Sequence, residues 1–191
     1  ISKKDYFNLD YLLSKRFGWM NAFIQNSEEG LEVGAGAGLS KQFILNKNLK
    51  TSDFSNHQHL DFKDVDAQKT KFSENSFDYI ISSNMLHHIP YPIKFFQETH
   101  RILKKGGKLI IEEVTCSLAL QLVIILMRHE GFDFTVDPWS TTQPVTDEKN
   151  VWSGNIAVTN LIFDNINLFE EKVGNLYKIE HHKNYECLIF L

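Results

Sequence analysis

The chain has 191 residues, enough for one domain with a sizeable core and too few for two full domains with a linker. Apolar residues make up 42% and charged residues 23%, proportions that exclude a disordered or fibrous chain. Lys and Arg number 20 against 24 Asp and Glu, and the resulting net charge of −4 argues against a protein that wraps nucleic acid, which usually presents a basic face.

The chain begins with a segment of helical periodicity. Residues 10–25 carry apolar side chains at three- and four-residue spacing, which predicts one or two amphipathic helices and a helical cover over residues 1–28. Short strands and helices then alternate, a pattern typical of a parallel sheet with helices on both faces. Strands are expected over 31–33, 49–52, 77–82 and 108–114, and helices over 40–45, 92–103, 117–128 and 155–164.

The carboxyl-terminal third is less regular. Residues 132–154 show no periodicity and contain two prolines and two tryptophans, so we expect a long ordered loop or insertion of the kind that often forms a lid. Two short strands over 177–182 and 185–191, joined at Lys183 and Asn184, predict a final antiparallel hairpin.

The sequence predicts neither a membrane span nor a signal peptide. The longest apolar run, residues 118–127, is far shorter than the roughly 20 residues that a membrane helix needs, and we expect it to cover the sheet. Residues 1–6 carry charges where a signal peptide is apolar. Cys116 and Cys187 match no paired metal or redox spacing, as expected of buried thiols in a soluble cytoplasmic protein. The missing initial Met and the apolar end are consistent with a piece of a longer chain.

A glycine cluster is the sharpest feature of the sequence. Gly34, Gly36 and Gly38 follow Glu32 at the end of a predicted strand and before a predicted helix. Small residues in such a turn let a ligand approach the backbone, and N–H groups are free at the start of a helix. The spacing G-x-G-x-G departs from the dinucleotide pattern G-x-G-x-x-G. A carboxylate at Glu32 disfavours a pyrophosphate and suits an ammonium group, which favours a ligand with a cationic amino-acid end over NAD.

Over residues 31–114 the sequence resembles the class I S-adenosylmethionine (SAM) dependent methyltransferases, in particular the methyltransferase type 11 group. The glycine cluster, the acidic Asp53 at a strand end, the strand within 73–86 and the helix and turn over 95–107 occur in the family's order. The resemblance implies a three-layer, Rossmann-like α/β fold with a mostly parallel seven-strand sheet and a C-terminal antiparallel hairpin, in a single domain over residues 1–191. It also implies SAM as cofactor and S-adenosylhomocysteine (SAH) as product.

The resemblance further implies a cofactor site at the carboxyl ends of the strands. Asp53 would accept hydrogen bonds from the ribose hydroxyls and Phe54 would pack on the adenine ring. Asp66 resembles the aspartate that faces the adenine amino group, while Ser83 and Asn84 would line the methionine end. The structural alternatives are a plain turn at the glycines, a helix cap at Asp53 and a plain surface or capping residue at Asp66. The expected cofactor-binding residues are Glu32, Gly34, Ala35, Gly36, Gly38, Asp53, Phe54, Asp66, Ala67, Ser83 and Asn84.

Two histidines are the candidate catalytic residues. His87 and His88 follow the strand over 77–82, near the place expected for the transferred methyl group. A histidine with a near-neutral pKa can take a proton from a hydroxyl acceptor. Alternatively the pair only shapes the loop, because proximity and orientation can suffice for methyl transfer. His57, His59 and Asp61 alternate like metal ligands on one strand face, but no fourth ligand is evident and no metal is expected.

The predicted function is transfer of a methyl group from SAM to a small molecule, by a monomer or homodimer without nucleic-acid or membrane partners. The Asn-Pro-Pro-Tyr type motif of base amino methylation is absent after the strand over 77–82. One alternative is a SAM-binding protein without catalysis that regulates or scaffolds a partner. Another is a nicotinamide-dependent oxidoreductase, which Glu32 and the glycine spacing disfavour.

Two stretches depart from the family pattern. The segment between Asp53 and Asp66 is short, so the helix usual there is expected to be reduced or missing. Residues 132–154 match nothing general in the family, and substrate specificity normally sits in this region. The sequence therefore predicts the cofactor and leaves the acceptor open.

Overall fold

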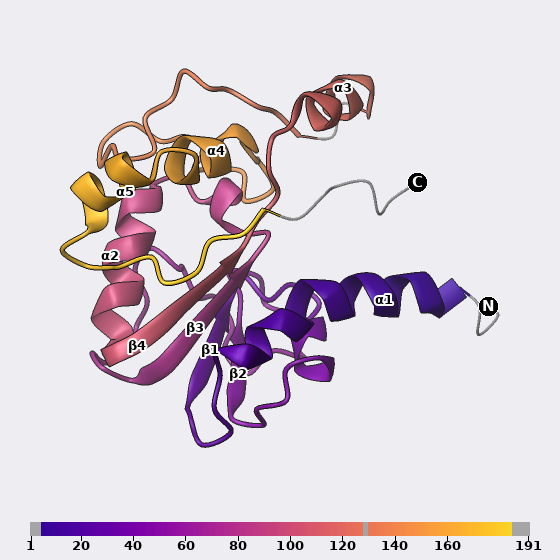
Figure 1. Ribbon diagram of the computed structural model, residues 1–191, viewed down its shortest axis with the longest axis vertical. Coiled ribbons are helices and arrows are strands. Elements are labelled where there is room, and N and C mark those ends of the chain that lie inside the picture. Colours follow the sequence, from indigo (N-terminus) through magenta and orange to yellow (C-terminus); the bar gives the residue numbers. More distant parts are fainter. Residues whose placement is uncertain (1–4, 128–129, 185–191) are drawn as a thin grey trace.

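The computed structural model describes residues 5–127 and 130–184, with a parallel sheet between helical layers (Figure 1). In this part of the chain the strands are β1 (Gly30–Val33), β2 (Leu49–Ser52), β3 (Phe77–Ser83) and β4 (Leu103–Glu112). The α-helices are α1 (Asp5–Gly18), α2 (Pro92–Ile102), α3 (Leu118–Met127), α4 (Ala157–Phe163) and α5 (Ile166–Val173). The short 3-10 helices are η1 (Trp19–Ala22), η2 (Leu39–Gln42) and η3 (Leu86–His88).

The chain changes direction across the sheet at β1. This strand pairs in parallel with β2 on one side and β3 on the other, and the sheet order is β2-β1-β3-β4. The chain therefore leaves β1 for one neighbour, crosses back to the other and then continues outward. In open α/β sheets, ligands bind beyond the carboxyl ends of the strands at such a switch point. The residues that end β1, β2 and β3 are Val33, Ser52 and Ser83.

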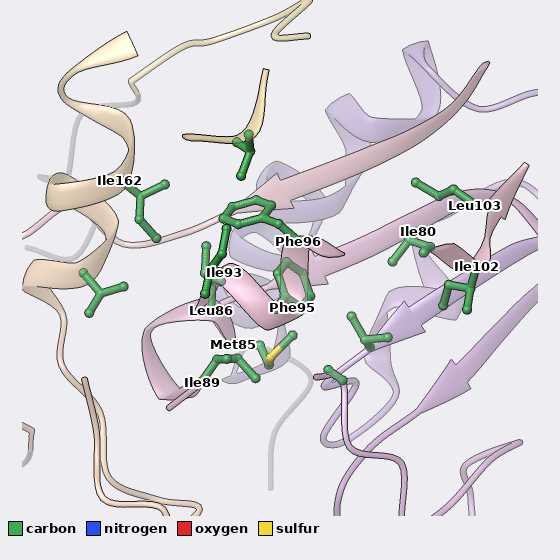
Figure 2. Packing of buried hydrophobic residues seen from close by; sticks show 14 of the residues in the cluster. Ile80, Met85, Leu86, Ile89, Ile93, Phe95, Phe96, Ile102, Leu103 and Ile162 are labelled. Atoms are coloured by element: carbon green, nitrogen blue, oxygen red, sulfur yellow. The ribbon is translucent and has the colours of Figure 1, made fainter. Parts of the chain in front are cut away.

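Alternate residues of β3 face two separate helical layers. Ile80 is buried in a cluster with residues of α2, α4 and α5, among them Phe95 and Ile162 (Figure 2). Tyr79 and Ile81 belong to a second cluster, which contains residues of α1 and η1. The two-residue period of the strand thus places one core on each face of the sheet.

Helix α1 and η1 cover the second face, within the residues 1–28 for which a helical cover was expected. Phe17 and Met20 pack there with Tyr79. The Tyr79 ring also lies against the backbone of β1, where a Cβ built on Gly30 would be 2.0 Å from the ring Cζ atom. This close approach requires a glycine at the start of β1.

The sheet differs from the seven strands expected, since the described residues contain four. Between β2 and β3 the described chain makes a single isolated bridge, which joins Ser52 and Phe62. Asp64 then has a left-handed φ of 54°, which ends extended pairing. Residues 53–60 contain no helix, as the short spacing before Asp66 predicted.

The expected C-terminal hairpin is not confirmed. Residues 177–182 contain no strand. This segment instead packs through side chains on the first cluster, and the hydroxyl of Tyr177 donates a hydrogen bond to Oγ1 of Thr99 at 2.9 Å. The second expected strand, 185–191, lies outside the described residues.

One helix prediction was wrong, and one confirmed helix does not pack as expected. The helix expected over 40–45 is only the 3-10 turn η2. Helix α3, expected to cover the sheet, buries only Ile124, while Leu126 is 80% exposed. The buried side packs with Cys116 and Ile156 in a small cluster apart from the two main ones. The reason lies in the path of the chain, which carries α3 past the end of β4 to one side of the molecule (Figure 1).

Most of the other strand and helix predictions agree closely with the structure. Strand β3 and helix α2 are confirmed, and α4 lies inside the predicted helix over 155–164. Strand β4 begins earlier than expected, because the extended chain continues through an irregularity in which Gly106 has a φ of 77°. Helix α5 was not predicted; it begins after Asn165, whose Oδ1 caps the backbone N–H of Leu168. Among the described residues no helix is long and apolar enough to cross a membrane.

Candidate functional site

The glycine loop follows β1 and turns at the carboxyl edge of the sheet. Gly34, Gly36 and Gly38 have positive φ values of 70°, 49° and 66°, a region that residues with a Cβ rarely adopt. The backbone N–H of Ala35 donates to the carbonyl of Ser52 at 3.0 Å, which ties the loop to the end of β2. The path of the chain therefore requires these glycines.

The backbone is open at the centre of this loop. A Cβ built on Gly36 would meet no heavy atom within 4 Å, whereas one on Gly34 would lie 2.2 Å from Cγ of Met85. The Nε2 atom of His59 lies 2.9 Å from the carbonyl oxygen of Gly36. The open space at Gly36 fits a ligand that approaches the backbone closely, as expected of the cofactor.

Asp53 joins the loop to the end of β2. Its Oδ2 accepts the backbone N–H of Gly36 at 2.8 Å, and its Oδ1 accepts that of Ser55 at 2.8 Å. Each carboxylate oxygen keeps a second lone pair, so hydrogen bonds to two ligand hydroxyls remain possible. The neighbouring residue Phe54 is 57% exposed, and the buried Oγ of Ser55 has no hydrogen-bond partner among the described residues. An open ring beside polar groups fits a nucleoside.

Glu32 is buried in β1. Its Oε2 accepts a hydrogen bond from the hydroxyl of Ser40 in η2. Burial raises the pKa of Glu32 to about 7; the Ser40 hydrogen bond opposes this shift and the charge of Asp53 adds to it. Glu32 thus links β1 to η2, and its expected role toward a cationic ligand stays a prediction.

Two polar residues stand at the end of β3. The hydroxyl of Ser83 donates to Oε2 of Glu112 at 2.8 Å, and the backbone N–H of Asn84 donates to the Glu112 carbonyl at 2.8 Å. Asn84 has a φ of 49°, and its buried Oδ1 has no hydrogen-bond partner within the described ranges. A left-handed residue with an unpaired buried acceptor is a typical feature of a ligand site. The acceptor suits an ammonium group.

Asp66 and Ala67 lie in the loop after β2. The Oδ1 of Asp66 accepts the backbone N–H of Gln68 at 2.8 Å, which is a turn-capping contact. The backbone N–H of Val65 donates to the carbonyl of Asp53 at 2.9 Å, so this loop runs beside the other expected nucleoside contacts. Ala67 is part of the first core cluster. Contact of Asp66 with adenine stays a prediction.

His87 is buried in η3, directly beyond β3. Its Nδ1 lies 2.6 Å from Oε2 of Glu113, the residue after β4. The Oε1 of Glu113 accepts the backbone N–H groups of Met85 at 2.7 Å and Leu86 at 2.5 Å, so three contacts hold this carboxylate. Burial alone lowers the pKa of His87, but the hydrogen bond and the charge of Glu113 outweigh it and the pKa is raised.

His88 lies beside His87, with ring centroids 4.2 Å apart. Its Nδ1 is 3.1 Å from the carbonyl oxygen of Ser153. Burial lowers the pKa of His88, and the neighbouring His87 lowers it further. Opposite pKa shifts in two adjacent titratable groups are typical of sites that move protons.

Sequence reasoning missed the partner of His87. The available signal was the acidic pair Glu112 and Glu113 at the end of an apolar strand, which parallel pairing carries to the edge where the histidines lie. The position of His59 beside the glycine loop was also missed, because no local sequence pattern predicts it.

Comparison with known proteins gives one family and several partial relatives. Residues 31–111 match the family model described as a methyltransferase domain. The chain is 32% identical over 75 residues to the ubiquinone/menaquinone biosynthesis C-methyltransferase UbiE of Rickettsia felis, covering 39% of this chain and 30% of that protein. It is 31% identical over 125 residues to the hybrid PKS-NRPS synthetase iliA of Neonectria sp., covering 53% of this chain and 3% of the synthetase. The chain thus spans less than a third of each relative.

Solved structures also overlap with the chain in part. The CurJ carbon methyltransferase is 22% identical, with a TM-score of 0.40 over 46% of this chain and 29% of that chain. The PH0226 protein of Pyrococcus horikoshii is 21% identical, with a TM-score of 0.43 over 66% of this chain and 62% of that chain. At TM-scores below 0.5, these overlaps do not bear on activity.

Proposed function

Residues 31–111 belong to the methyltransferase domain family, so the chain carries a SAM-dependent methyltransferase domain. We propose that this domain methylates a small molecule. One observation carries the proposal: an open glycine loop, an acidic residue beside it and a buried histidine–carboxylate pair all lie at the carboxyl ends of the strands. The net charge of −4 supports a small acceptor over nucleic acid.

The residues around the glycine loop would hold SAM. Gly36 offers an open backbone, Asp53 would accept the ribose hydroxyls, and Phe54 would pack on the adenine ring. The unpaired Oδ1 of Asn84 would accept a hydrogen bond from the ammonium group. When bound, SAM supplies an electrophilic methyl group on a positively charged sulfur, so the main task of the protein is to orient the reactants.

His87 is the proposed general base. Its Nδ1–H donates to Glu113, which leaves the Nε2 lone pair to accept a proton. The Glu113 carboxylate would stabilise the imidazolium that forms when the acceptor loses its proton. General-base catalysis of this kind contributes roughly 10²- to 10⁴-fold in rate. A base favours an oxygen or carbon acceptor that must be deprotonated, and one partial relative is named a C-methyltransferase.

Calorimetric titration with SAH tests the cofactor. We expect saturable binding of SAH and no binding of NADH, which is the ligand expected if the chain were an oxidoreductase instead. Asp53→Ala should weaken SAH binding about 10- to 100-fold, the range for hydrogen bonds to a charged group. Glu171→Gln, which changes an exposed acid on α5 paired with Lys172, should bind SAH as wild type does. Failure of the well-folded wild-type protein to bind SAH would contradict the proposal.

A further inference from the structure

Beside the His87–Glu113 pair, three side chains offer ligand atoms to a common point, and we propose that His87, His88 and Glu130 form a binding site for a zinc-class divalent cation. Nε2 of His87 lies 3.8 Å from Oε2 of Glu130, and Nε2 of His88 lies 4.0 Å from Oε1 of the same carboxylate. One ligand atom from each of the three residues lies within 4.8 Å of the others. This site goes beyond methyl transfer and does not rest on it.

The spacing needs only a small closure to hold an ion. Tetrahedral zinc with bonds of about 2.0–2.1 Å places its ligand atoms about 3.3 Å apart. The three ligand atoms lie within 4.8 Å of one another, so each pair would have to close by at most about 1.5 Å, through side-chain torsions of Glu130 and the two histidines. The two imidazoles are already adjacent, because η3 places them on consecutive residues.

The outer nitrogens of both histidines provide a second, independent observation. Nδ1 of His87 contacts the Glu113 carboxylate at 2.6 Å, and Nδ1 of His88 contacts the Ser153 carbonyl at 3.1 Å. An oxygen acceptor at Nδ1 keeps the proton on that nitrogen and leaves the Nε2 lone pair for a metal. Metal-ligating histidines almost always make such an outer hydrogen bond, to a carboxylate, a carbonyl or water. Here the His87 ring contacts a carboxylate and the His88 ring contacts a backbone carbonyl.

The surroundings hold the rings in place and leave an entry path. The side chain of His87 is 4% exposed, whereas those of Glu130 and His88 are 18% and 24% exposed. A Cβ built on Gly154 would lie 3.1 Å from Cε1 of His88 and 3.3 Å from Cδ2 of His87. The backbone at Gly154 therefore packs against both rings, while the partly exposed side chains of His88 and Glu130 reach solvent.

The ligand set selects the kind of ion. Two imidazoles and a carboxylate suit zinc and neighbouring transition metals, whereas Mg²⁺ and Ca²⁺ prefer oxygen ligands alone. Three protein ligands leave a fourth position for water or an acceptor oxygen, as in catalytic zinc sites. The ion and a proton would compete for Nε2 of His87, so a metal-loaded protein lacks the general base proposed above.

Titration of the tag-free, chelator-treated protein with Co²⁺, and competition with Zn²⁺, tests the site directly. We expect one equivalent of Co²⁺ to give visible absorption bands of a four-coordinate site, and Zn²⁺ to abolish them. Glu130→Gln and His88→Asn should each weaken Co²⁺ binding at least about tenfold, comparable to the 10- to 100-fold cost of disturbing a supporting outer-shell contact. Circular dichroism confirms folding, and Glu130→Gln decides alone if His88→Asn is unfolded.

A double variant supplies the matched control. His57→Asn with His59→Asn removes an exposed pair of stacked histidines, with ring centroids 5.5 Å apart, and should leave Co²⁺ binding unchanged. The proposal is overturned if wild-type protein binds no Co²⁺, if Glu130→Gln binds it as tightly as wild type, or if the double variant loses it. SAH calorimetry on metal-free protein judges the methyltransferase proposal separately.

Discussion

Nδ1 of His87 lies 2.6 Å from Oε2 of Glu113, although 26 residues separate the two in the chain. Parallel pairing of β3 with β4 brings them together, because η3 follows one strand and Glu113 follows the other at the same edge of the sheet. The same carboxylate accepts the backbone N–H groups of Met85 and Leu86. The sheet thus builds a buried pair from residues that no local sequence pattern connects.

Glu113→Gln should lower the pKa of His87. Burial already lowers this pKa, and the hydrogen bond and charge of Glu113 raise it above the ordinary value. Without the carboxylate, only the weaker effects of the Glu130 and Glu112 charges oppose the effect of burial on this pKa. NMR titration of the histidine ring signals of both proteins measures the change. An unchanged His87 pKa in the variant would show that the contact carries no charge interaction.

The raised pKa of His87 also predicts how the effect of Glu113→Gln on the stability of the fold depends on pH. A raised pKa of His87 means that its charged form stabilises the fold below the unfolded pKa of about 6.5, and that this stabilisation is lost as pH rises through the folded pKa. The stability advantage of the wild-type protein over Glu113→Gln should therefore be larger at pH 5.5 than at pH 8.5. Urea unfolding of both proteins at the two pH values measures it.

Glu32 should make the fold less stable as pH rises. Burial raises the pKa of its carboxyl to about 7, so the folded protein binds the proton more tightly than the unfolded chain does. The stability given by the protonated form is lost as pH rises from about 4.5 through 7, by roughly 3 kcal/mol for this single group. Glu32→Gln should flatten this part of the pH profile in urea unfolding. Parallel profiles for the two proteins would contradict the prediction.

Gly30→Ala should destabilise the protein. The new Cβ would lie 2.0 Å from the Tyr79 ring, and overpacking of this kind costs about 1–3 kcal/mol. Gly18→Ala is the matched control, because Gly18 has a helical φ of −60° and nothing within 4 Å of its Cβ position. That substitution should stabilise by about 0.5–1 kcal/mol. Thermal unfolding distinguishes the two, and equal effects would argue against the close contact in the sheet.

Gly36→Ala should weaken SAH binding with only a modest loss of stability. Nothing lies near the new Cβ, so the cost to the fold is the left-handed φ of 49°, about 1–2 kcal/mol. The methyl group would occupy the open space over the loop, and affinity should fall at least about tenfold if the cofactor contacts the backbone there. Calorimetric titration of Gly36→Ala and of the control Gly18→Ala with SAH measures the change in affinity. Wild-type affinity in Gly36→Ala would exclude that contact.

Helix α3 should tolerate charge on its outer face. Leu126 is 80% exposed, so Leu126→Glu should change stability by less than about 0.5 kcal/mol. Ile124, 7% exposed, packs with Cys116 and Ile156, so Ile124→Ala should cost about 2 kcal/mol or more. A large loss from Leu126→Glu in urea unfolding would mean that α3 covers apolar surface in solution.

Local sequence patterns predict the parts of the fold that depend on neighbouring residues. Strand β3 and helix α2 were predicted because an apolar run and an amphipathic period are written in contiguous positions. The resemblance to the methyltransferases places the glycine loop and Asp53 in one site, and a hydrogen bond from the backbone N–H of Gly36 to Asp53 joins them.

Contacts that depend on strand order and on the paths of connecting segments emerge only once the chain is folded. The partner of His87, the convergence of Glu130 on two histidines and the exposed face of α3 all join residues distant in sequence. An apolar period predicts that a face will be buried, but it does not state which surface covers it. Likewise, a residue type predicts a possible role, and the arrangement of the sheet selects its partner.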